Sequence, residues 1–329
     1  MAMLTRRHLP ALAGMLAPLG INLPGIARAQ GNWPDRPIRV VVPFGAGGPT
    51  DVVARLLAEP VGAALGQPLV IENRAGAGGN LGSRIVAQAA PDGYTLALNA
   101  SSPLVINQFL YRDLGYDPAT AFAPISMLTT GPLLVVTNPR LPFATIADLV
   151  AEAKRRPGAL NYATAGNGTV PHLATEMFLR EAGIQMTNVT YRQTPDATQS
   201  VMRGDTAVFF DSPQSIQHVR AGLLKALAVT TPRRFGAFPE VPTMAESGGP
   251  AISVEAWYGL LAPAGTPAPI IARLHDVFAT AIKRPEVASR IATLGFETVG
   301  NTPAEFARFL AAEPPKWRDV IRAADVRLE

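Results

Sequence analysis

The chain has 329 residues, of which 48% are hydrophobic and 16% are charged, and it contains no cysteine. This composition excludes a disordered chain, and the absence of cysteine excludes disulfides, thiolate catalysis and cysteine-ligated metals. Three of the 29 basic residues and none of the 25 acidic residues precede residue 30, which leaves 26 basic against 25 acidic residues in the remainder. Nucleic acid is therefore not an expected partner.

The first 29 residues have the organisation of a secretory signal peptide. Arg6 and Arg7 precede a short apolar stretch at 9–23, and the small-x-small sequence Ala27-Arg28-Ala29 follows. A positive start, an apolar run and a small-residue site together predict export with cleavage near Ala29. The paired arginines suit either the general or the twin-arginine route. The apolar run is too short and too rich in Gly and Pro to span a bilayer stably. The alternative to a signal peptide is a disordered or anchoring N-terminus.

Strands and helices are predicted to alternate along the remaining residues. In chain order we expect a strand at 38–44, a helix capped by Thr50 or Asp51 and kinked at Pro60, a strand at 68–72, a helix at 80–90 and a strand at 94–99. The pattern restarts with a strand at 133–137, a helix at 145–155, a strand at 161–164, a helix at 171–181 and strands at 189–191, 207–210 and 225–230.

A tract rich in Pro and Gly at 232–250 ends this second block. A strand at 257–262 and helices at 267–283, 285–294 and 303–324 follow it. Strands that alternate with helices through short loops predict the α/β class with parallel sheets, and the length is sufficient for two domains.

Glycine-rich turns stand at two strand-to-helix junctions. In the turn at 45–50, Thr50 occupies the place of the third glycine of a dinucleotide fingerprint and Pro49 removes a backbone N–H, so we expect no nucleotide cofactor. A helix that begins after such a turn is still a ready anion site, because its first N–H groups are unpaired and partly positive. The turns at 45–51 and 165–169 would together hold a carboxylate by backbone groups, although each alone is also explained as a tight turn.

The sequence offers little catalytic chemistry. The histidines are His8, His172, His218 and His275, and neither a His-Glu-x-x-His zinc motif nor a Gly-x-Ser-x-Gly nucleophile elbow occurs. We therefore expect a protein that is not an enzyme, with no catalytic residue, metal or cofactor. Two roles stay open for His172, which either contacts a ligand or caps and packs locally. Asp211 and Asp51 are likewise either helix caps or pocket contacts.

Six stretches of the sequence carry a family resemblance. They are VPFGAGGPTD at 42–51, ENRAGAGGN at 72–80, APDGYTL at 90–96, YATAGNGT at 162–169, FPEVPT at 238–243 and WYGLLAPAGTP at 257–267. Over residues 33–329 the chain resembles the Bug family, the periplasmic solute-binding proteins of tripartite tricarboxylate transporters. Two departures from many relatives, Tyr191-Arg192-Gln193 and Val170-Pro171 before His172, leave the identity of the ligand open.

The resemblance implies a type II-like periplasmic-binding-protein architecture, with two α/β lobes joined by two crossings and a ligand cleft between them. Residues 30–132 plus 255–329 would form one lobe and residues 133–254 the other. Loops from both lobes would hold the ligand's carboxylate. The implied ligand-binding residues are Phe44, Ala46, Gly47, Gly48, Thr50, Asp51, Ser101, Ala165, Gly166, Asn167, Gly168, Thr169, His172 and Asp211.

The implied function is transport. A periplasmic monomer would capture a dicarboxylate, a tricarboxylate, an aromatic carboxylate or an amino acid, and would deliver it to the membrane permease of a tripartite tricarboxylate transporter. Two alternatives remain at this stage. The liganded protein could signal to a sensor kinase, or the same scaffold could be a periplasmic hydrolase or lyase with His172 as its base.

Overall fold

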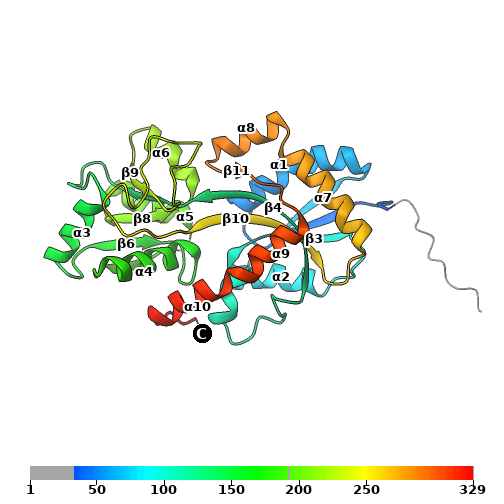
Figure 1. The fold of residues 1–329 in the computed structure, drawn as a ribbon, viewed down its shortest axis with the longest axis horizontal. Helices are drawn as coiled ribbons and strands as arrows, with labels where there is room; N and C mark the ends of the chain where they lie inside the picture. Colours follow the sequence, from blue (N-terminus) through cyan, green and yellow to red (C-terminus); the bar gives the residue numbers. More distant parts are fainter. Residues whose placement is uncertain (1–32, 192, 329) are drawn as a thin grey trace, which may run out of the picture. The chain divides into compact units, whose positions relative to one another are not determined.

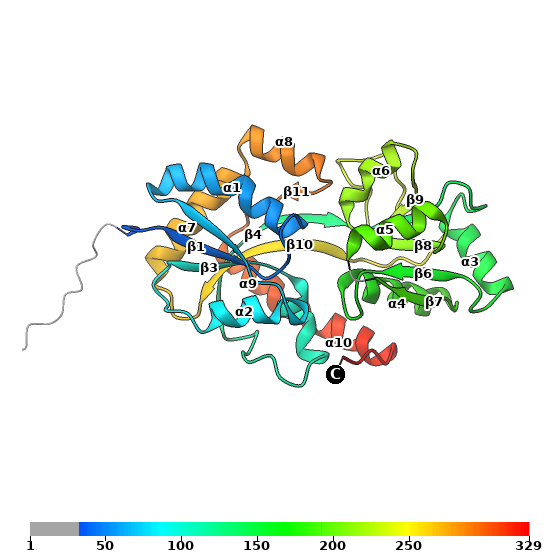
Figure 2. The same cartoon turned by 180° about the vertical axis from the view of Figure 1, so that it is seen from behind.

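The computed structural model describes residues 33–191 and 193–328, so the predicted signal peptide at 1–29 lies outside the described residues. Residues from Pro34 onward form one compact unit built on two β-sheets (Figures 1 and 2). Each sheet carries its own helices, which gives the two α/β lobes expected from the sequence. Among the described residues, no helix has the length and apolarity needed to cross a membrane.

The first sheet has six strands in the order β11-β4-β10-β3-β1-β2. Its strands are β1 (Ile38–Val42), β2 (Leu69–Asn73), β3 (Thr95–Ala100), β4 (Phe122–Pro132), β10 (Glu255–Pro263) and β11 (Glu297–Thr298). The β-branched run of β1 is buried at the centre of a parallel trio with β2 and β3. Because the carboxyl ends of parallel strands meet at one edge, the loops after these three strands gather there.

The second sheet has five strands in the order β7-β6-β8-β5-β9. They are β5 (Leu134–Thr137), β6 (Asn161–Thr164), β7 (Thr187–Thr190), β8 (Val208–Asp211) and β9 (Lys225–Val229). Strand β6 runs parallel to both β7 and β8, so the glycine turn after β6 again lies at a carboxyl edge.

Helices cover both sheets. Those of the first lobe are α1 (Pro49–Leu65), α2 (Asn80–Ala87), α7 (Ala268–Ile282), α8 (Pro285–Thr293) and α9 (Pro303–Ala312), and those of the second are α3 (Ile146–Arg155), α4 (Val170–Ala182), α5 (Thr194–Arg203) and α6 (Ile216–Arg220). Short helical turns are η1 (Ala77–Gly79), η2 (Ser102–Ile106), η3 (Asn107–Phe109) and η4 (Pro213–Ser215).

The helices of the second lobe cover both faces of its sheet. Side chains alternate along a strand, so Phe210 of β8 packs against Phe178 of α4, whereas Phe209 packs in the hydrophobic cluster that includes residues of α5. Helices α4 and α5 therefore cover opposite faces of the second sheet.

Two connections join the lobes, one from β4 to β5 and one from β9 to β10. Thr230 holds these connections together, because its buried hydroxyl accepts the Leu133 N–H (2.8 Å) and donates to the Val254 carbonyl (2.6 Å). Backbone hydrogen bonds from Thr230 N to Leu133 O and from Val254 N to Thr230 O, both 3.1 Å, complete the junction. A single residue thus fastens both crossings.

The C-terminal region forms two helices where the sequence analysis expected one at 303–324. Helix α9 ends at Ala312 and α10 (Pro314–Ala323) begins after Glu313. The break falls at Pro314-Pro315, since proline lacks an N–H and its ring clashes with the preceding turn. Helix α9 packs on β4 of the first lobe, whereas α10 contacts α4 of the second lobe as well as η2 and η3 of the first.

Several other predictions were wrong. Both sheets are mixed and not parallel, because β10 runs antiparallel to β3 and β4, and β5 runs antiparallel to β8 and β9. Helix α1 is capped by Gly48, with Pro49 as its first residue, so neither Thr50 nor Asp51 is the N-cap. Helix α2 ends at Ala87 instead of residue 90. Strand β4 was not expected, because Pro124 and Ser126 interrupt its apolar pattern. Strand β10 pairs with it through two irregularities in register, and Gly259 is required there because a Cβ would lie 2.2 Å from the Phe306 ring of α9.

We predict that Thr230→Val destabilises the protein by about 1–3 kcal/mol, because it leaves the Leu133 N–H buried without an acceptor. Urea unfolding monitored by circular dichroism measures this loss. Thr187→Val is the matched control, since its hydroxyl is exposed and a change within about 0.5 kcal/mol is expected. Equal losses in the two variants would contradict the role given to Thr230.

Candidate functional site

The loop after β1 is held from behind by side chains of α1 and β2. Asp51 Oδ2 accepts the backbone N–H of Gly47 (2.8 Å) and the Nε of Arg55 (2.9 Å). Asn73, the last residue of β2, donates to the Phe44 carbonyl (3.1 Å) and accepts from Arg55 (3.1 Å). Gly47 has a φ of 79°, which suits glycine, and residues 45–47 are exposed. The loop therefore has a fixed conformation and an accessible backbone.

Asp51 is the buried charge of this loop, with 2% of its surface exposed. Burial raises the pKa of Asp51, but the hydrogen bonds from Arg55, Gly47 and Asn73 and the charge of Arg55 together outweigh burial and hold the pKa below its usual value. Its second oxygen, Oδ1, is buried and has no hydrogen-bond partner among the described residues. The polar contacts of Asp51 thus go to its own loop and helix and to Asn73 of β2.

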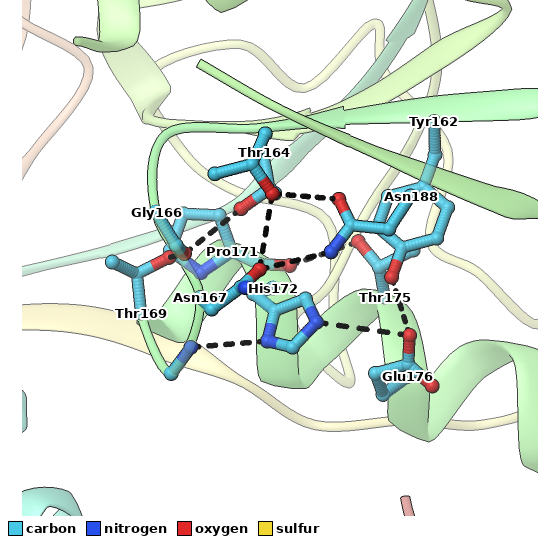
Figure 3. A network of polar contacts seen from close by, with 12 residues as sticks. Tyr162, Thr164, Gly166, Asn167, Thr169, Pro171, His172, Thr175, Glu176 and Asn188 are labelled. Carbon is cyan, nitrogen blue, oxygen red and sulfur yellow. Dashed lines mark hydrogen bonds and ion pairs between the residues drawn. The ribbon is translucent and has the colours of Figure 1, made fainter. Parts of the chain in front are cut away.

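The loop after β6 is fixed in the same manner in the second lobe (Figure 3). The Gly166 carbonyl accepts the hydroxyls of Thr164 (3.1 Å) and Thr169 (2.7 Å). Asn167 Oδ1 accepts Asn188 Nδ2 (3.0 Å) and the Thr190 hydroxyl (3.1 Å), both from β7. These hydrogen bonds attach the loop to its own sheet.

His172 lies behind this loop, in the first turn of α4, and is 4% exposed. Its Nδ1 accepts the Gly168 N–H (3.1 Å), and its ring stacks on Tyr162 with centroids 6.4 Å apart. Its Nε2 lies 3.8 Å from Glu176 Oε1, and the Tyr162 hydroxyl donates to the same oxygen. Burial lowers the pKa of His172, and the charge of Glu176 offsets this only in part.

Asp211 closes β8 and is fully buried. Its carboxylate accepts the Thr198 hydroxyl (2.7 Å), the Ser212 N–H (2.6 Å) and the Ser215 hydroxyl. Burial raises the pKa of Asp211, and the hydrogen bonds from Ser215 and Thr198 lower it only in part. The N-cap of the following turn, η4, is Ser212, so Asp211 is not the helix cap that was one of its two predicted roles.

The remaining predicted residues fall into two groups. Asn167 and Ala46 are exposed and Phe44, Gly48, Ala165, Gly166 and Thr169 are half-buried, whereas Thr50, Ser101 and Gly168 are buried.

In the first lobe, a Cβ built on Gly79 would lie 3.2 Å from Phe44 and 3.1 Å from Pro103, so the loops after β1, β2 and β3 meet there. No hydrogen bond or ion pair joins residues 44–51 to residues 165–172 among the described residues.

The second loop does make a contact across the lobes. A Cβ built on Gly168 would lie 2.5 Å from Leu110 Cδ1, which follows η3, and 3.0 Å from Leu328 Cδ1, near the C-terminus. The sequence analysis missed these neighbours, and it also missed Asn73, Asn188 and Glu176. Only Glu176 left a signal in the sequence, since it stands four residues after His172 on the same face of a helix.

Two α/β lobes with paired crossings, and with loops at the carboxyl edges of both sheets, are the architecture of the periplasmic solute-binding proteins. Residues 53–326 match the model of the tripartite tricarboxylate transporter family receptor. The chain belongs to this family, as the resemblance to the Bug proteins predicted.

Three relatives illustrate the similarity. The chain is 36% identical over 321 residues to Protein BugT of Bordetella pertussis, which covers 97% of this chain and 96% of BugT. A Rhodopseudomonas palustris protein solved with adipate has a TM-score of 0.83 and 34% identity, covering 90% of this chain and 100% of its own. MatC of Rhodopseudomonas palustris, solved with bound malate, has a TM-score of 0.78 and 34% identity, covering 88% of this chain and 99% of its own.

We predict that Asp51→Asn costs about 1 kcal/mol at pH 7, because a neutral acceptor replaces a charged one under Gly47 and Arg55. The pKa of Asp51 is lowered by folding, so its stabilisation is complete above about pH 3.9 and is lost as the pH falls through the folded-state pKa. The difference between the two proteins should therefore shrink in acid. Urea unfolding at pH 7 and pH 3 measures it.

The control is Asp319→Asn, at an exposed position whose ion pair within the described part of the chain is with its neighbour Arg318. It should differ little from the wild type at either pH. A constant difference between Asp51→Asn and the wild type across this range would contradict the account.

Proposed function

We propose that this chain is a periplasmic receptor that captures a small organic carboxylate and delivers it to the membrane permease of a tripartite tricarboxylate transporter. One observation carries the proposal. At the start of α1 and again at the start of α4, a glycine-rich loop is locked by a side chain four residues further on, Gly47 by Asp51 and Gly168 by His172. Each lobe therefore presents a fixed loop at a helix N-terminus.

Helix geometry explains why such termini suit a carboxylate. The first helical hydrogen bonds are those from Val52 N to Gly48 O (3.0 Å) and from Leu173 N to Thr169 O (2.9 Å). The N–H groups that precede them in each first turn have no acceptor within the helix. Together with the helix dipole they attract an anion without any Arg or Lys side chain. The predicted ligand-binding residues are in keeping with this, since they include neither.

Ligand capture would proceed by closure of the lobes. A ligand that contacts both loops stabilises a closed state that is minor without it. We assign residues 30–132 plus 255–329 to one lobe and residues 133–254 to the other, with Thr230 at the crossings. The predicted signal peptide supports export to the periplasm with cleavage near Ala29, and a monomer suffices for this cycle.

A hydrolase or lyase on the same scaffold would need His172 as its base. Its Nδ1 is occupied by the Gly168 N–H, its Nε2 faces Glu176 and its ring is buried. This placement favours binding without turnover. The relatives solved with adipate and with malate suggest dicarboxylates as first probes for the ligand.

We predict that adipate or malate raises the melting temperature of purified 30–329. A ligand at about 100 times its dissociation constant adds about 2.7 kcal/mol, and a protein of this size gains roughly 2–4 °C per kcal/mol. Differential scanning fluorimetry measures the shift. Adipamide, which has the same shape as adipate but no charge, should give none. Equal shifts from the acid and the amide, or stabilisation by nucleotides alone, would contradict the proposal.

We also predict that Gly168→Ala weakens binding of the stabilising carboxylate at least about tenfold. Gly168 has a φ of +75°, which an L side chain strains, and an added Cβ would overlap the end of the Leu110 side chain, so the loop or that side chain must shift. Gly158→Ala is the matched control, because Gly158 has a φ of +74° and open space around it. Both variants should lose about 1–2 kcal/mol of stability through backbone strain, but only Gly168→Ala should lose affinity in isothermal titration. Equal affinities would remove this loop from the site.

A further inference from the structure

We propose that His172 is a positioning residue for the ligand loop at 165–169, and that its neutral ring makes ligand affinity depend on pH. The effect on ligand affinity rests on the proposed function, whereas the positioning of the loop by His172 does not. The geometry is a chain of contacts that runs from Tyr162 through Glu176 and His172 to the Gly168 amide (Figure 3).

The hydrogen bond to Gly168 determines where the ring proton resides. A histidine nitrogen that accepts a hydrogen bond carries no proton, so Nδ1 is bare and the proton of the neutral ring is on Nε2. That nitrogen faces Glu176, whose carboxylate is in turn fixed by the Tyr162 hydroxyl. The charge of Glu176 favours the same tautomer, the one that allows His172 to hold the loop.

Solvent protons can reach His172 by way of Glu176. Its side chain is 24% exposed and borders a cavity of about 490 Å³ between α4 and α10. The other charged residue of the cavity lining is Arg180, which pairs with Glu181. Helix α10 and its C-cap contribute the apolar residues Val320, Ala323 and Ala324. On the loop side, the neighbours of Gly168 are Leu110 and Leu328, which carry no charge. Among the described residues, the titratable groups that contact the ring are Glu176 and Tyr162.

Protonation of His172 would release the loop. A charged imidazolium donates from both nitrogens, so Nδ1–H would face the Gly168 N–H and the hydrogen bond would be lost. Because burial lowers the pKa of His172, the ring stays neutral at neutral pH and becomes charged only in acid. The hydrogen bond is therefore complete above the ordinary histidine pKa of about 6.5 and is lost as the pH falls through the lower pKa of the folded protein.

The equivalent position of the first lobe responds differently. Asp51 accepts the Gly47 N–H with a carboxylate whose pKa is lowered, so that hydrogen bond persists to more acidic pH. Of the two hydrogen bonds, the one in the second lobe is thus lost first as the pH falls. A periplasmic receptor with this arrangement would release its ligand as its surroundings acidify.

Three variants of the exported chain test the inference. His172→Asn places an amide oxygen near the position of Nδ1, so it keeps an acceptor for Gly168 but cannot titrate. His172→Ala removes the acceptor. Glu176→Gln keeps a partner for Tyr162 but removes the charge that raises the pKa of His172.

The first readout needs no ligand. Amide hydrogen exchange followed by NMR should find Gly168 protected in the wild type at pH 7.5, and the protection factor should fall about tenfold at pH 5 and in His172→Ala. His172→Asn should restore protection at both pH values. Imidazole ¹⁵N shifts should identify the Nε2–H tautomer in the wild type. An unprotected Gly168 amide, or the opposite tautomer, would overturn the positioning role whether or not a ligand is known.

The second readout is the affinity for adipate and malate by isothermal titration at pH 7.5 and pH 5. Wild-type affinity should fall about tenfold more than that of His172→Asn, a comparison that cancels protonation of the ligand itself. In Glu176→Gln the pH at which half of the affinity loss has occurred should be lower than in the wild type. A merely structural role of Glu176 would not cause this shift. Identical pH profiles for the wild type and His172→Asn would refute the inference. Protection of Gly168 without binding of any carboxylate would instead refute the proposed function.

Discussion

The site depends on one repeated interaction, the hydrogen bond from a loop glycine N–H to a side chain four residues later in the first turn of a helix. Gly47 meets Asp51 in the first lobe and Gly168 meets His172 in the second. Glycine is needed in these loops because both residues have positive φ, and the helical side chain adds an acceptor for the glycine N–H to the restraints that the neighbouring strands supply. The result in each lobe is a rigid loop in front of unpaired helix amides.

The rest of the fold supplies the positions of these two loops. Parallel strands bring the turns after β1 and β6 to the carboxyl edges of their sheets, where ligand sites of α/β proteins form. The two connections that Thr230 joins by hydrogen bonds link the lobes covalently, and α10 also contacts both lobes. A solute-binding protein needs such a structure, in which rigid lobes move about few connections.

Much of this could be predicted from the sequence, because local patterns determine it. Alternation of strands and helices predicted the α/β class, glycine turns predicted the two helix starts, and the stretches at 42–51 and 162–169 predicted the family. The caps and breaks were readable but misjudged: Pro49 is a signal for the first helical position, and Pro314-Pro315 for a break. Strand β4 and the partners of Asn167 and Asp211 could not be predicted, because Asn188, Thr190 and Thr198 reach them only through tertiary structure.

The central claim is that helix-terminal amides, and not cationic side chains, hold the ligand. A crystal structure of the exported chain with the carboxylate that stabilises it most tests this claim directly. The account predicts carboxylate oxygens about 2.7–3.2 Å from first-turn amides of α1 or α4, directly or through one water. A carboxylate paired with an Arg or Lys side chain, or bound in the cavity between α4 and α10, would contradict it.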